Sequence, residues 1–343
     1  MKVAVIGAGM AGLSCAQRLR TAGIEVELFE KSRGLGGRMA TRWLGDLAER
    51  RGFDHGAPYF TARHPAFIEI LNDLQAARSV AVWEAMMLDC TGSAEFPPVP
   101  RPTRQWVGTP GMTSVAKSFG QGLKVHLQTR VVEITRSLSG RWTLNVNTQN
   151  GQDRLPEWDA VVLAVPAEQA ADLLPSGSSL SSVARSVVSV PYWNVMLELA
   201  QPLVTGFDLA ELPAVGVLQR VVRDSAKPGR AVGERWVLQT TRAWSEHHIE
   251  AGAVDVATLV SEAFDAFLVS LGHAGLVDTP PPLSLNAHRW LYASPAKPLE
   301  RTFVWDDAEQ LAVCGDWLKG TDVESAFLSG RALGEALSAY FLA

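Results

Sequence analysis

The sequence predicts an α/β protein joined to a second part of α+β character, and three observations support this. A short apolar run at residues 2–6 leads directly into a glycine-rich turn at residues 7–12. Helical and strand periodicity then alternate over residues 10–29, which is typical of a parallel sheet covered by helices. Apolar runs at residues 160–165 and 311–314 are typical of further buried parallel strands.

The composition limits the class of protein. The 343 residues are 47% hydrophobic and 20% charged, which suffices for about two domains. A net charge of −5, with arginines spread along the chain, argues against nucleic acid as the main partner. The three cysteines form no CxxC pair and no zinc spacing, so we expect a reducing compartment and no metal. No signal peptide or membrane-spanning run is recognised, and we therefore expect a cytoplasmic protein with no membrane partner.

The first thirty residues predict a dinucleotide site. A strand at residues 2–6 feeds the turn GAGMAG, and the turn opens a helix at residues 10–21. Backbone N–H groups and the positive end of the helix dipole then face a pyrophosphate. A second strand at residues 24–29 ends in a glutamate, which is placed to accept hydrogen bonds from ribose hydroxyls. The contacts expected here come from Gly7, Ala8, Gly9, Met10, Ala11, Gly12 and Glu30.

A second glycine cluster at residues 31–39 favours FAD over NAD. It carries a guanidinium that can bind the pyrophosphate through a fork of donors, and NAD dehydrogenases do not need this second clamp. Its expected cofactor contacts are Lys31, Ser32, Gly36, Gly37, Arg38 and Met39.

Seven motifs along the chain together resemble bacterial renalase and the renalase-like NAD/FAD-dependent oxidoreductases of the flavin-containing amine oxidase superfamily. The motifs are GAGMAG, LGGRMATR, FDHGAPYFTAR, WVGTPGM, WVLQTTRAWSEHH, AHRWLYA and CGDWLKGTDVESAFLSG. The resemblance implies a flavoprotein with two dinucleotide-binding domains, in which a Rossmann-like FAD domain carries a mixed-sheet substrate domain. Because Trp317 stands where related enzymes carry a cysteine that bonds the flavin, we expect noncovalent FAD.

The same resemblance implies further cofactor contacts. They lie beside the flavin ring, the adenine, the pyrophosphate, the ribityl chain and the N1–C2=O side of the flavin, where the positive end of a helix stabilises reduced flavin. In that order they are Gly56, Ala57 and Pro58; Val131 and Val132; Ala164 and Pro166; Gly315 and Asp316; and Val323, Glu324 and Ala326. Many relatives carry Gln at the position of Pro58, so one side-chain contact is missing here. A surface hairpin at residues 53–63 and a simple buried strand end at Ala164 remain open alternatives.

Candidates for the substrate pocket come from residues 53–63 and from the tryptophan-rich second half. They are Tyr59, Thr61, Arg63, Trp193, Trp244, His247, His248 and Trp290. For the tryptophans a core position is the alternative, and for the histidines a solvated helix start. Arg242, Arg289 and Lys319 are candidates for a substrate phosphate or are ordinary surface charges.

The predicted organisation is discontinuous. Residues 1–64, 105–170 and 300–343 form the FAD-binding domain, and residues 65–104 and 171–299 form the substrate domain, with a proline-rich hairpin near 97–102. Glycines and a proline in the loop between residues 202 and 232 permit closure over the pocket.

The function implied by the resemblance is hydride removal from the 1,2- or 1,6-dihydro isomers of NAD(P)H. The products are NAD(P)+ and, with O2 as acceptor, hydrogen peroxide. Two alternatives stay open: an FAD-dependent oxidase or dehydrogenase of an amine or another small molecule, and an FAD-binding or redox-sensing protein without turnover.

Overall fold

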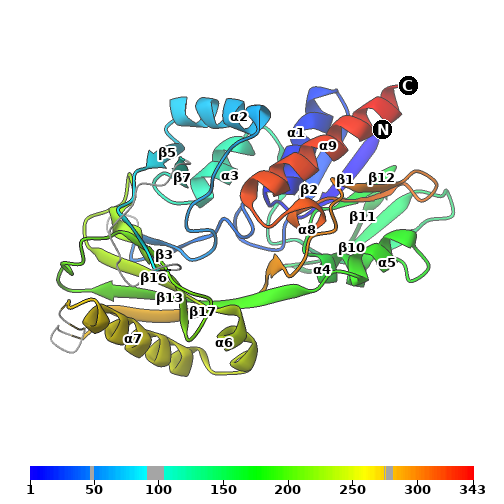
Figure 1. The fold of residues 1–343 in the computed structure, drawn as a ribbon. Coiled ribbons are helices and arrows are strands. Elements are labelled where there is room, and N and C mark those ends of the chain that lie inside the picture. Colours follow the sequence, from blue (N-terminus) through cyan, green and yellow to red (C-terminus); the bar gives the residue numbers. More distant parts are fainter. Residues whose placement is uncertain (47–49, 91–103, 274, 276–280) are drawn as a thin grey trace.

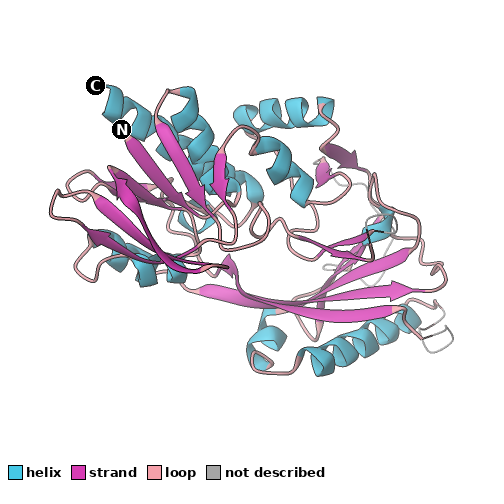
Figure 2. Ribbon diagram, turned by 180° about the vertical axis from the view of Figure 1, so that it is seen from behind, coloured by secondary structure: helices cyan, strands magenta, loops and turns pink. Residues whose placement is uncertain are grey.

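The structure is a computed structural model that describes residues 1–46, 50–90, 104–273, 275 and 281–343. Two lobes lie side by side (Figure 1). One lobe holds both chain ends, and the other is built on long strands with helices on their outer face, as the view from behind also shows (Figure 2).

The first lobe is centred on a six-stranded sheet in the order β18-β19-β12-β1-β2-β8. Its strands are β1 (Lys2–Ile6), β2 (Glu25–Phe29), β8 (Lys124–His126), β12 (Ala160–Leu163), β18 (Val304–Asp306) and β19 (Leu311–Val313). All neighbours are parallel except β18 and β19. The four strands predicted from apolar runs are therefore confirmed, and they lie next to one another.

Helices α1 (Met10–Thr21) and α9 (Val323–Leu342) cover one face of this sheet. They cross closely, because a Cβ built on Gly330 would lie 1.9 Å from the carbonyl oxygen of Ala11. The alternation of β1 explains the two cores: Val3 and Val5 pack on the helix side, whereas Ala4 and Ile6 pack on the other.

A three-stranded antiparallel sheet and two helices cover that other face. These elements are β9 (Arg130–Arg136), β10 (Trp142–Thr148), β11 (Gly151–Trp158), α4 (Ala167–Leu173) and α5 (Ser179–Arg185). Strands β9 and β10 form a hairpin, and β11 extends it as a third strand.

The second lobe is a six-stranded sheet in the order β17-β13-β16-β15-β14-β6. Its strands are β6 (Met87–Asp89), β13 (Ser189–Leu199), β14 (Leu209–Glu211), β15 (Leu218–Arg223), β16 (Glu234–Thr240) and β17 (Ser284–Pro295). Helices α6 (Arg242–His247) and α7 (Ala253–Ser270) cover its outer face (Figure 1). The segment between residues 202 and 232, expected to be a loop, contains β14, β15 and the short 3-10 helix η1 (Asp224–Ala226). Part of it therefore belongs to the second sheet.

Shorter elements lie between the two lobes. They are β3 (Thr41–Leu44), β4 (Arg51–Asp54), α2 (Pro65–Ala76), β5 (Val80–Trp83), β7 (Gln105–Gly108) and α3 (Thr113–Phe119). Strand β5 pairs with β7, and Phe67 of α2 contacts Phe327 of α9 with ring centroids 4.8 Å apart. The predicted substrate domain included residues 65–104. Of these, β6 does join the second sheet, whereas α2 and β5 pack against α9 and β7, which were predicted to belong to the FAD-binding domain. The proline-rich hairpin predicted near 97–102 lies outside the described residues.

In the part of the chain that the structure describes, no helix has both the length and the apolar character needed to cross a bilayer.

A buried carboxylate on β2 gives a test of the first lobe. Burial alone would raise the pKa of Glu27, but hydrogen bonds from Lys124, His126 and Lys2 bring that pKa down to about 2. Replacement of Glu27 by Gln is expected to lower the free energy of unfolding at pH 7 by about 2 kcal/mol.

The difference in free energy of unfolding between wild type and Glu27→Gln is expected to shrink as the pH falls. Because the folded-state pKa of Glu27 lies below the ordinary 4.5, its contribution is fully present above pH 4.5 and is lost as the pH falls through about 2. Urea unfolding of both proteins between pH 7 and pH 3 measures this. Glu25→Gln is the matched control, since Glu25 is 62% exposed and only 3.5 Å from Lys2 Nζ. An equal loss in both variants would contradict the prediction.

Candidate functional site

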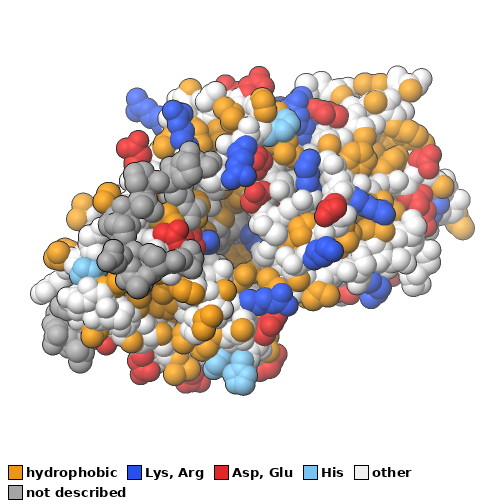
Figure 3. All heavy atoms as spheres, viewed as in Figure 1, with side chains coloured by type: hydrophobic (Ala, Val, Ile, Leu, Met, Phe, Trp, Pro, Cys, Tyr) orange, Lys and Arg blue, Asp and Glu red, His pale blue; other side chains and the backbone are white. Residues whose placement is uncertain are grey.

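A large cavity with a volume of about 1290 Å³ receives residues from both lobes. The space-filling view shows a recess between the lobes (Figure 3). The volume exceeds the roughly 300–1,000 Å³ of an ordinary small-molecule site, which leaves room for a dinucleotide together with a second molecule.

Most residues predicted to contact the cofactor line this cavity. They are Gly7, Gly9, Met10, Ala11, Glu30, Lys31, Ser32, Gly36, Gly37, Arg38, Met39, Gly56, Ala57, Pro58, Val131, Val132, Ala164, Pro166, Gly315, Asp316, Val323 and Ala326. Ala8, Gly12 and Glu324 do not line it. The fold thus brings together segments from residues 7 to 326.

The glycine turn after β1 has the shape that a pyrophosphate requires. Gly7 has a φ of +102°, and its N–H donates to the carbonyl oxygen of Phe29 at 2.9 Å. A Cβ on Gly12 would lie 2.0 Å from the carbonyl oxygen of Gly7, whereas a Cβ on Gly9 would meet no protein atom within 4 Å. Gly12 is therefore required for helix–strand packing, and Gly9 leaves open space at the N-terminus of α1. This cradle fits a bound dinucleotide.

Glu30 is buried at the cavity wall, and its carboxylate is held in a fixed orientation. One oxygen accepts from the N–H of Ala8 and the other from the N–H of Ser32, each at 2.9 Å. Each oxygen keeps a further lone pair for a ribose hydroxyl. Ala8 therefore acts by orienting Glu30 and does not face the cavity. Beside it, burial lowers the pKa of Lys31, whose Nζ donates to Gln169.

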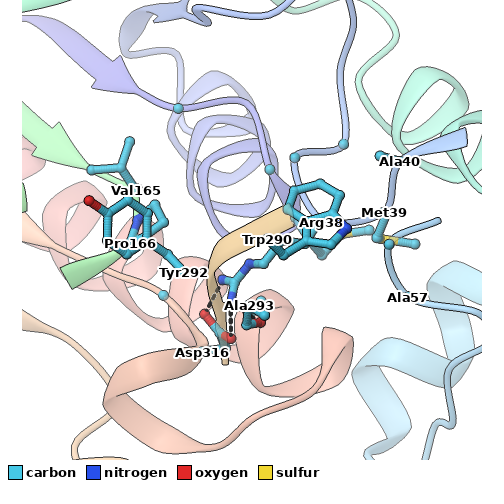
Figure 4. Close-up of a pocket in the computed structure, with 18 of the residues that line it drawn as sticks. Arg38, Met39, Ala40, Ala57, Val165, Pro166, Trp290, Tyr292, Ala293 and Asp316 are labelled. Atoms are coloured by element: carbon cyan, nitrogen blue, oxygen red, sulfur yellow. Dashed lines mark hydrogen bonds and ion pairs between the residues drawn. The ribbon is translucent and has the colours of Figure 1, made fainter. Parts of the chain in front are cut away.

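Arg38 and Asp316 face each other across the cavity wall (Figure 4). The guanidinium donates two hydrogen bonds to the carboxylate, at 2.8 and 2.5 Å, and a third to the carbonyl oxygen of Ala293 at 3.1 Å. Asp316 is the first residue of α8 (Asp316–Lys319). The pair joins the second glycine cluster to the C-terminal segment, and it balances the charge of the predicted clamp.

Residues 55–58 lie between the two lobes. A Cβ on Gly56 would lie 1.9 Å from the carbonyl oxygen of Arg38, and the N–H of Ala57 donates to that oxygen at 2.8 Å. The carbonyl oxygen of His55 accepts from the side chains of Asn194 and Trp290, each at 2.7 Å. This segment is therefore held by backbone contacts on one side and by the second sheet on the other.

A buried charged cluster anchors the same segment. We define the Asp54 cluster as Asp54, Asp224, Lys227 and Arg230, whose side chains are at most 1% exposed. Lys227 Nζ lies 3.0 Å from Asp54, and Arg230 also pairs with that carboxylate. The other Asp54 oxygen accepts from Thr41 at 2.7 Å and from the N–H of Met112 at 2.9 Å. Four separate segments meet here, so residues 224–230 are anchored to the segments of Thr41, Asp54 and Met112.

The cavity-facing side of the second sheet is polar and aromatic. It contributes Tyr192, Asn194, Gln219, Arg220, Gln239, His288, Trp290 and Tyr292 to the lining. Arg220 donates to Glu211 at 2.8 Å and to Gln239 at 3.0 Å. The His288 ring lies 4.8 Å from His55 and 4.7 Å from Trp290. Burial lowers the pKa of His55 to about 4 and, to a smaller extent, that of His288.

Four predicted pocket residues lie on the opposite face of this sheet. Trp193 is 3% exposed and packs in the core beneath α7, and its Nε1 donates to the carbonyl oxygen of His248 at 3.1 Å. Trp244 stacks on His248 with centroids 3.9 Å apart, and His247 neighbours it on α6. Because side chains alternate along a strand, Trp193 points away from the cavity that Tyr192 and Asn194 face. The placement of Trp193, Trp244, His247 and His248 in the pocket was wrong.

Of the other candidates for the substrate pocket, some line the cavity and some do not. Tyr59, Thr61, Arg63 and Trp290 line the cavity, as does Arg289, which pairs with Glu250 at 3.7 Å. Arg242 is exposed and pairs with Glu246, and Lys319 does not line the cavity. Glu324 accepts from the N–H groups of Arg63 and His64, each at 2.7 Å. Its predicted cofactor contact is therefore corrected to hydrogen bonds with the backbone just before α2.

Sequence reasoning missed part of the cavity wall. The missed residues are His55, Asn194, Gln219, Arg220, Gln239 and His288. The alternation of side chains along the sequence of β13 and β16 contained the signal, since Asn194 and Gln239 fall on the face opposite Trp193 and Leu238.

The remaining predictions concern cysteines and metals. Burial raises the pKa of Cys15 well above its ordinary value, with a contribution from Cys314, and raises that of Cys314 to about 12. Among the described residues, no group of three His, Cys, Asp or Glu side chains is arranged to hold a metal ion.

Comparison with known proteins agrees with this geometry. The NAD(P)-binding Rossmann-like domain matches residues 5–74, and the flavin containing amine oxidoreductase family matches residues 87–333. A 4,4'-diapophytoene desaturase from Staphylococcus aureus (strain Newman) is 56% identical over 39 residues. That match covers 11% of this chain and 8% of the desaturase.

Two solved structures share the whole fold. One is described as "Putative protoporphyrinogen oxidase" from Exiguobacterium sp. 255-15, with a TM-score of 0.71 and 14% identity. The other is a triple mutant of putrescine oxidase, with a TM-score of 0.68 and 14% identity. Each comparison covers 99% of both chains.

The fold and the glycine cradle define a dinucleotide-binding protein. The chain belongs to the flavin-containing amine oxidoreductase family, since the family match covers well over half of its length.

Proposed function

We propose that this protein is an oxidase that takes a hydride from the 1,2- or 1,6-dihydro isomers of NAD(P)H. The products are NAD(P)+ and, with O2, hydrogen peroxide. The observation that carries the proposal is the chemistry of the cavity-facing sheet. In the described part of the lining, this sheet contributes amide, guanidinium, imidazole and aromatic groups but no carboxylate.

The lack of a carboxylate on that face argues against an amine substrate. An amine is an ammonium ion at neutral pH, and burying it without an anionic partner is costly. A dihydronicotinamide has a neutral ring and a neutral carboxamide. Such a substrate matches the amides of Asn194, Gln219 and Gln239 and the flat rings of Tyr192 and Trp290.

The charges around the cavity suit a substrate whose ring becomes positive. The lowered pKa values keep His55 and His288 neutral at neutral pH, and Arg220 is paired with Glu211. These groups therefore bring little repulsion against a nicotinamide cation. No proton has to be removed when a hydride leaves carbon, so the side chains act by holding the ring and excluding water. When bound, FAD accepts the hydride and passes the electrons on.

We also propose which residues hold FAD. Gly7, Gly9 and the start of α1 bind the pyrophosphate, Glu30 binds the ribose, and Arg38 and Asp316 lie beside the linker to the flavin. All line the cavity. None of the three cysteines lines it, which supports noncovalent binding. The free cysteines also support a cytoplasmic location.

The proposal is tested by anaerobic mixing of the yellow holoprotein with base-isomerised NADH. We expect prompt loss of flavin absorbance with the 1,2- or 1,6-dihydro forms, and recovery with hydrogen peroxide when air is admitted. Putrescine and simple monoamines are the comparison. Flavin reduction by an amine, but not by either dihydronicotinamide isomer, would replace the proposal with an amine oxidase.

A further inference from the structure

Four polar side chains form a continuous row across the cavity-facing sheet. Arg220 on β15 pairs in register with Gln239 on β16, Gln239 with Asn194 on β13, and Asn194 with His288 on β17. All four line the cavity. Neighbouring strands lie roughly 4.8 Å apart, so adjacent members of the row can contact one small ligand group.

The hydrogen-bond partners fix the orientation of both amides. The guanidinium of Arg220 has only donors, and it donates to Oε1 of Gln239 at 3.0 Å. The backbone carbonyl of His55 only accepts, and it accepts from Nδ2 of Asn194 at 2.7 Å. The second end of each amide is thereby assigned as well: Nε2 of Gln239 is a donor and Oδ1 of Asn194 is an acceptor.

Neither Nε2 of Gln239 nor Oδ1 of Asn194 has a hydrogen-bond partner within the described part of the chain. Oδ1 of Asn194 is buried without a hydrogen bond, and Asn194 itself is 2% exposed. No described residue accepts a hydrogen bond from Nε2 of Gln239, a residue that lines the cavity. A buried acceptor without a donor destabilises the free protein, and a ligand N–H at this place removes that cost.

One donor beside one acceptor complements a primary carboxamide. The carbonyl oxygen of such a group accepts from Gln239, and its NH2 group donates to Asn194. A carboxylate would place an oxygen against Oδ1 of Asn194, and an ammonium would place a donor against Nε2 of Gln239. We propose that Asn194 and Gln239 bind the carboxamide of the substrate and select it over carboxylate and amine analogues. This deepens the proposed function and rests on it.

The test uses oxidised holoprotein and needs no turnover. Nicotinamide and nicotinate are each titrated while the flavin absorbance spectrum is followed. Wild type is expected to bind nicotinamide about tenfold more tightly than nicotinate or better, as one good hydrogen bond allows. Asn194→Ala and Gln239→Met are each expected to weaken nicotinamide binding about tenfold and to reduce the preference over nicotinate.

Asn286→Ala is the matched control. Asn286 lies on β17 of the same sheet, donates to Ser284 and does not line the cavity, so this variant keeps the wild-type preference. Asn194 also donates to the carbonyl oxygen of His55, so Asn194→Ala could lose FAD for a structural reason. In that case the result with Gln239→Met alone decides whether the carboxamide site exists. Equal binding of the two ligands by wild type, or an unchanged preference in Gln239→Met, would overturn the carboxamide site.

The two proposals fail in different ways. If no dihydronicotinamide isomer reduces the flavin but nicotinamide is preferred and the preference is lost in Gln239→Met, the carboxamide site stands and the oxidase proposal fails. If the isomers reduce the flavin but both variants keep the preference, the oxidase stands and the carboxamide site is wrong.

Discussion

Replacement of Gly9 by alanine is expected to leave the protein folded but to weaken FAD binding by about 100-fold or more. Gly9 caps α1 with φ −76° and ψ −179°, a conformation that alanine adopts without strain. A methyl group there meets no protein atom within 4 Å and projects into the space at the helix start. It keeps the pyrophosphate away from the backbone N–H groups that bind it. Equilibrium dialysis of FAD against the apoprotein measures the loss.

Gly12→Ala is the contrasting variant on the same turn. Its Cβ would lie 2.0 Å from the carbonyl oxygen of Gly7, and a backbone atom cannot rotate away as a side chain does. We expect it to destabilise the apoprotein by about 3 kcal/mol or more, which urea unfolding measures. Wild-type FAD affinity in Gly9→Ala would contradict the placement of the cofactor at this turn.

Replacement of Asp54 by Asn is expected to lower the free energy of unfolding by about 3–5 kcal/mol. Burial acts to raise the pKa of Asp54, yet Lys227 and Arg230 lower it overall, so the carboxylate is charged in the folded protein. Its removal leaves two buried cations with less anionic charge. Because His55 and Gly56 follow directly, weakened FAD binding is expected as well.

An exposed ion pair provides the control for this variant. Arg242 and Glu246 lie 2.7 Å apart, with side chains 50% and 45% exposed. Glu246→Gln is expected to change the free energy of unfolding by less than about 0.5 kcal/mol. Similar losses in Asp54→Asn and Glu246→Gln would show that the Asp54 cluster does not link the segments as argued.

The first lobe could be predicted well because its signals are local. A strand, a glycine turn, a helix and a second strand follow one another within thirty residues, and each has its own periodicity. The parallel strands 160–163 and 311–313 are also recognisable, since burial on both faces makes them wholly apolar.

The substrate side could not be predicted to the same depth, because its residues are defined by pairing between distant strands. Tryptophans drew attention to Trp193 and Trp244, although strand alternation places Asn194 and not Trp193 toward the cavity. The Asp54 cluster joins residue 54 to residues 224–230. Neither segment carries a sequence signal that predicts contact with the other. Glu324 was misplaced because its partners, the N–H groups of Arg63 and His64, lie just before a helix about 260 positions earlier in the chain.

The sheet order also determines when the cofactor can be loaded during synthesis. The glycine cradle emerges from the ribosome well before β12 and β19, but β1 is flanked by β12, and β12 in turn by β19 at Leu311–Val313. Asp316 and the helix that crosses α1 follow only after that strand. A nascent chain with only the cradle lacks the far wall of the FAD cavity, so high-affinity binding must wait until α9 (Val323–Leu342) has been made. Free FAD then stabilises the finished fold by mass action rather than guiding its early steps.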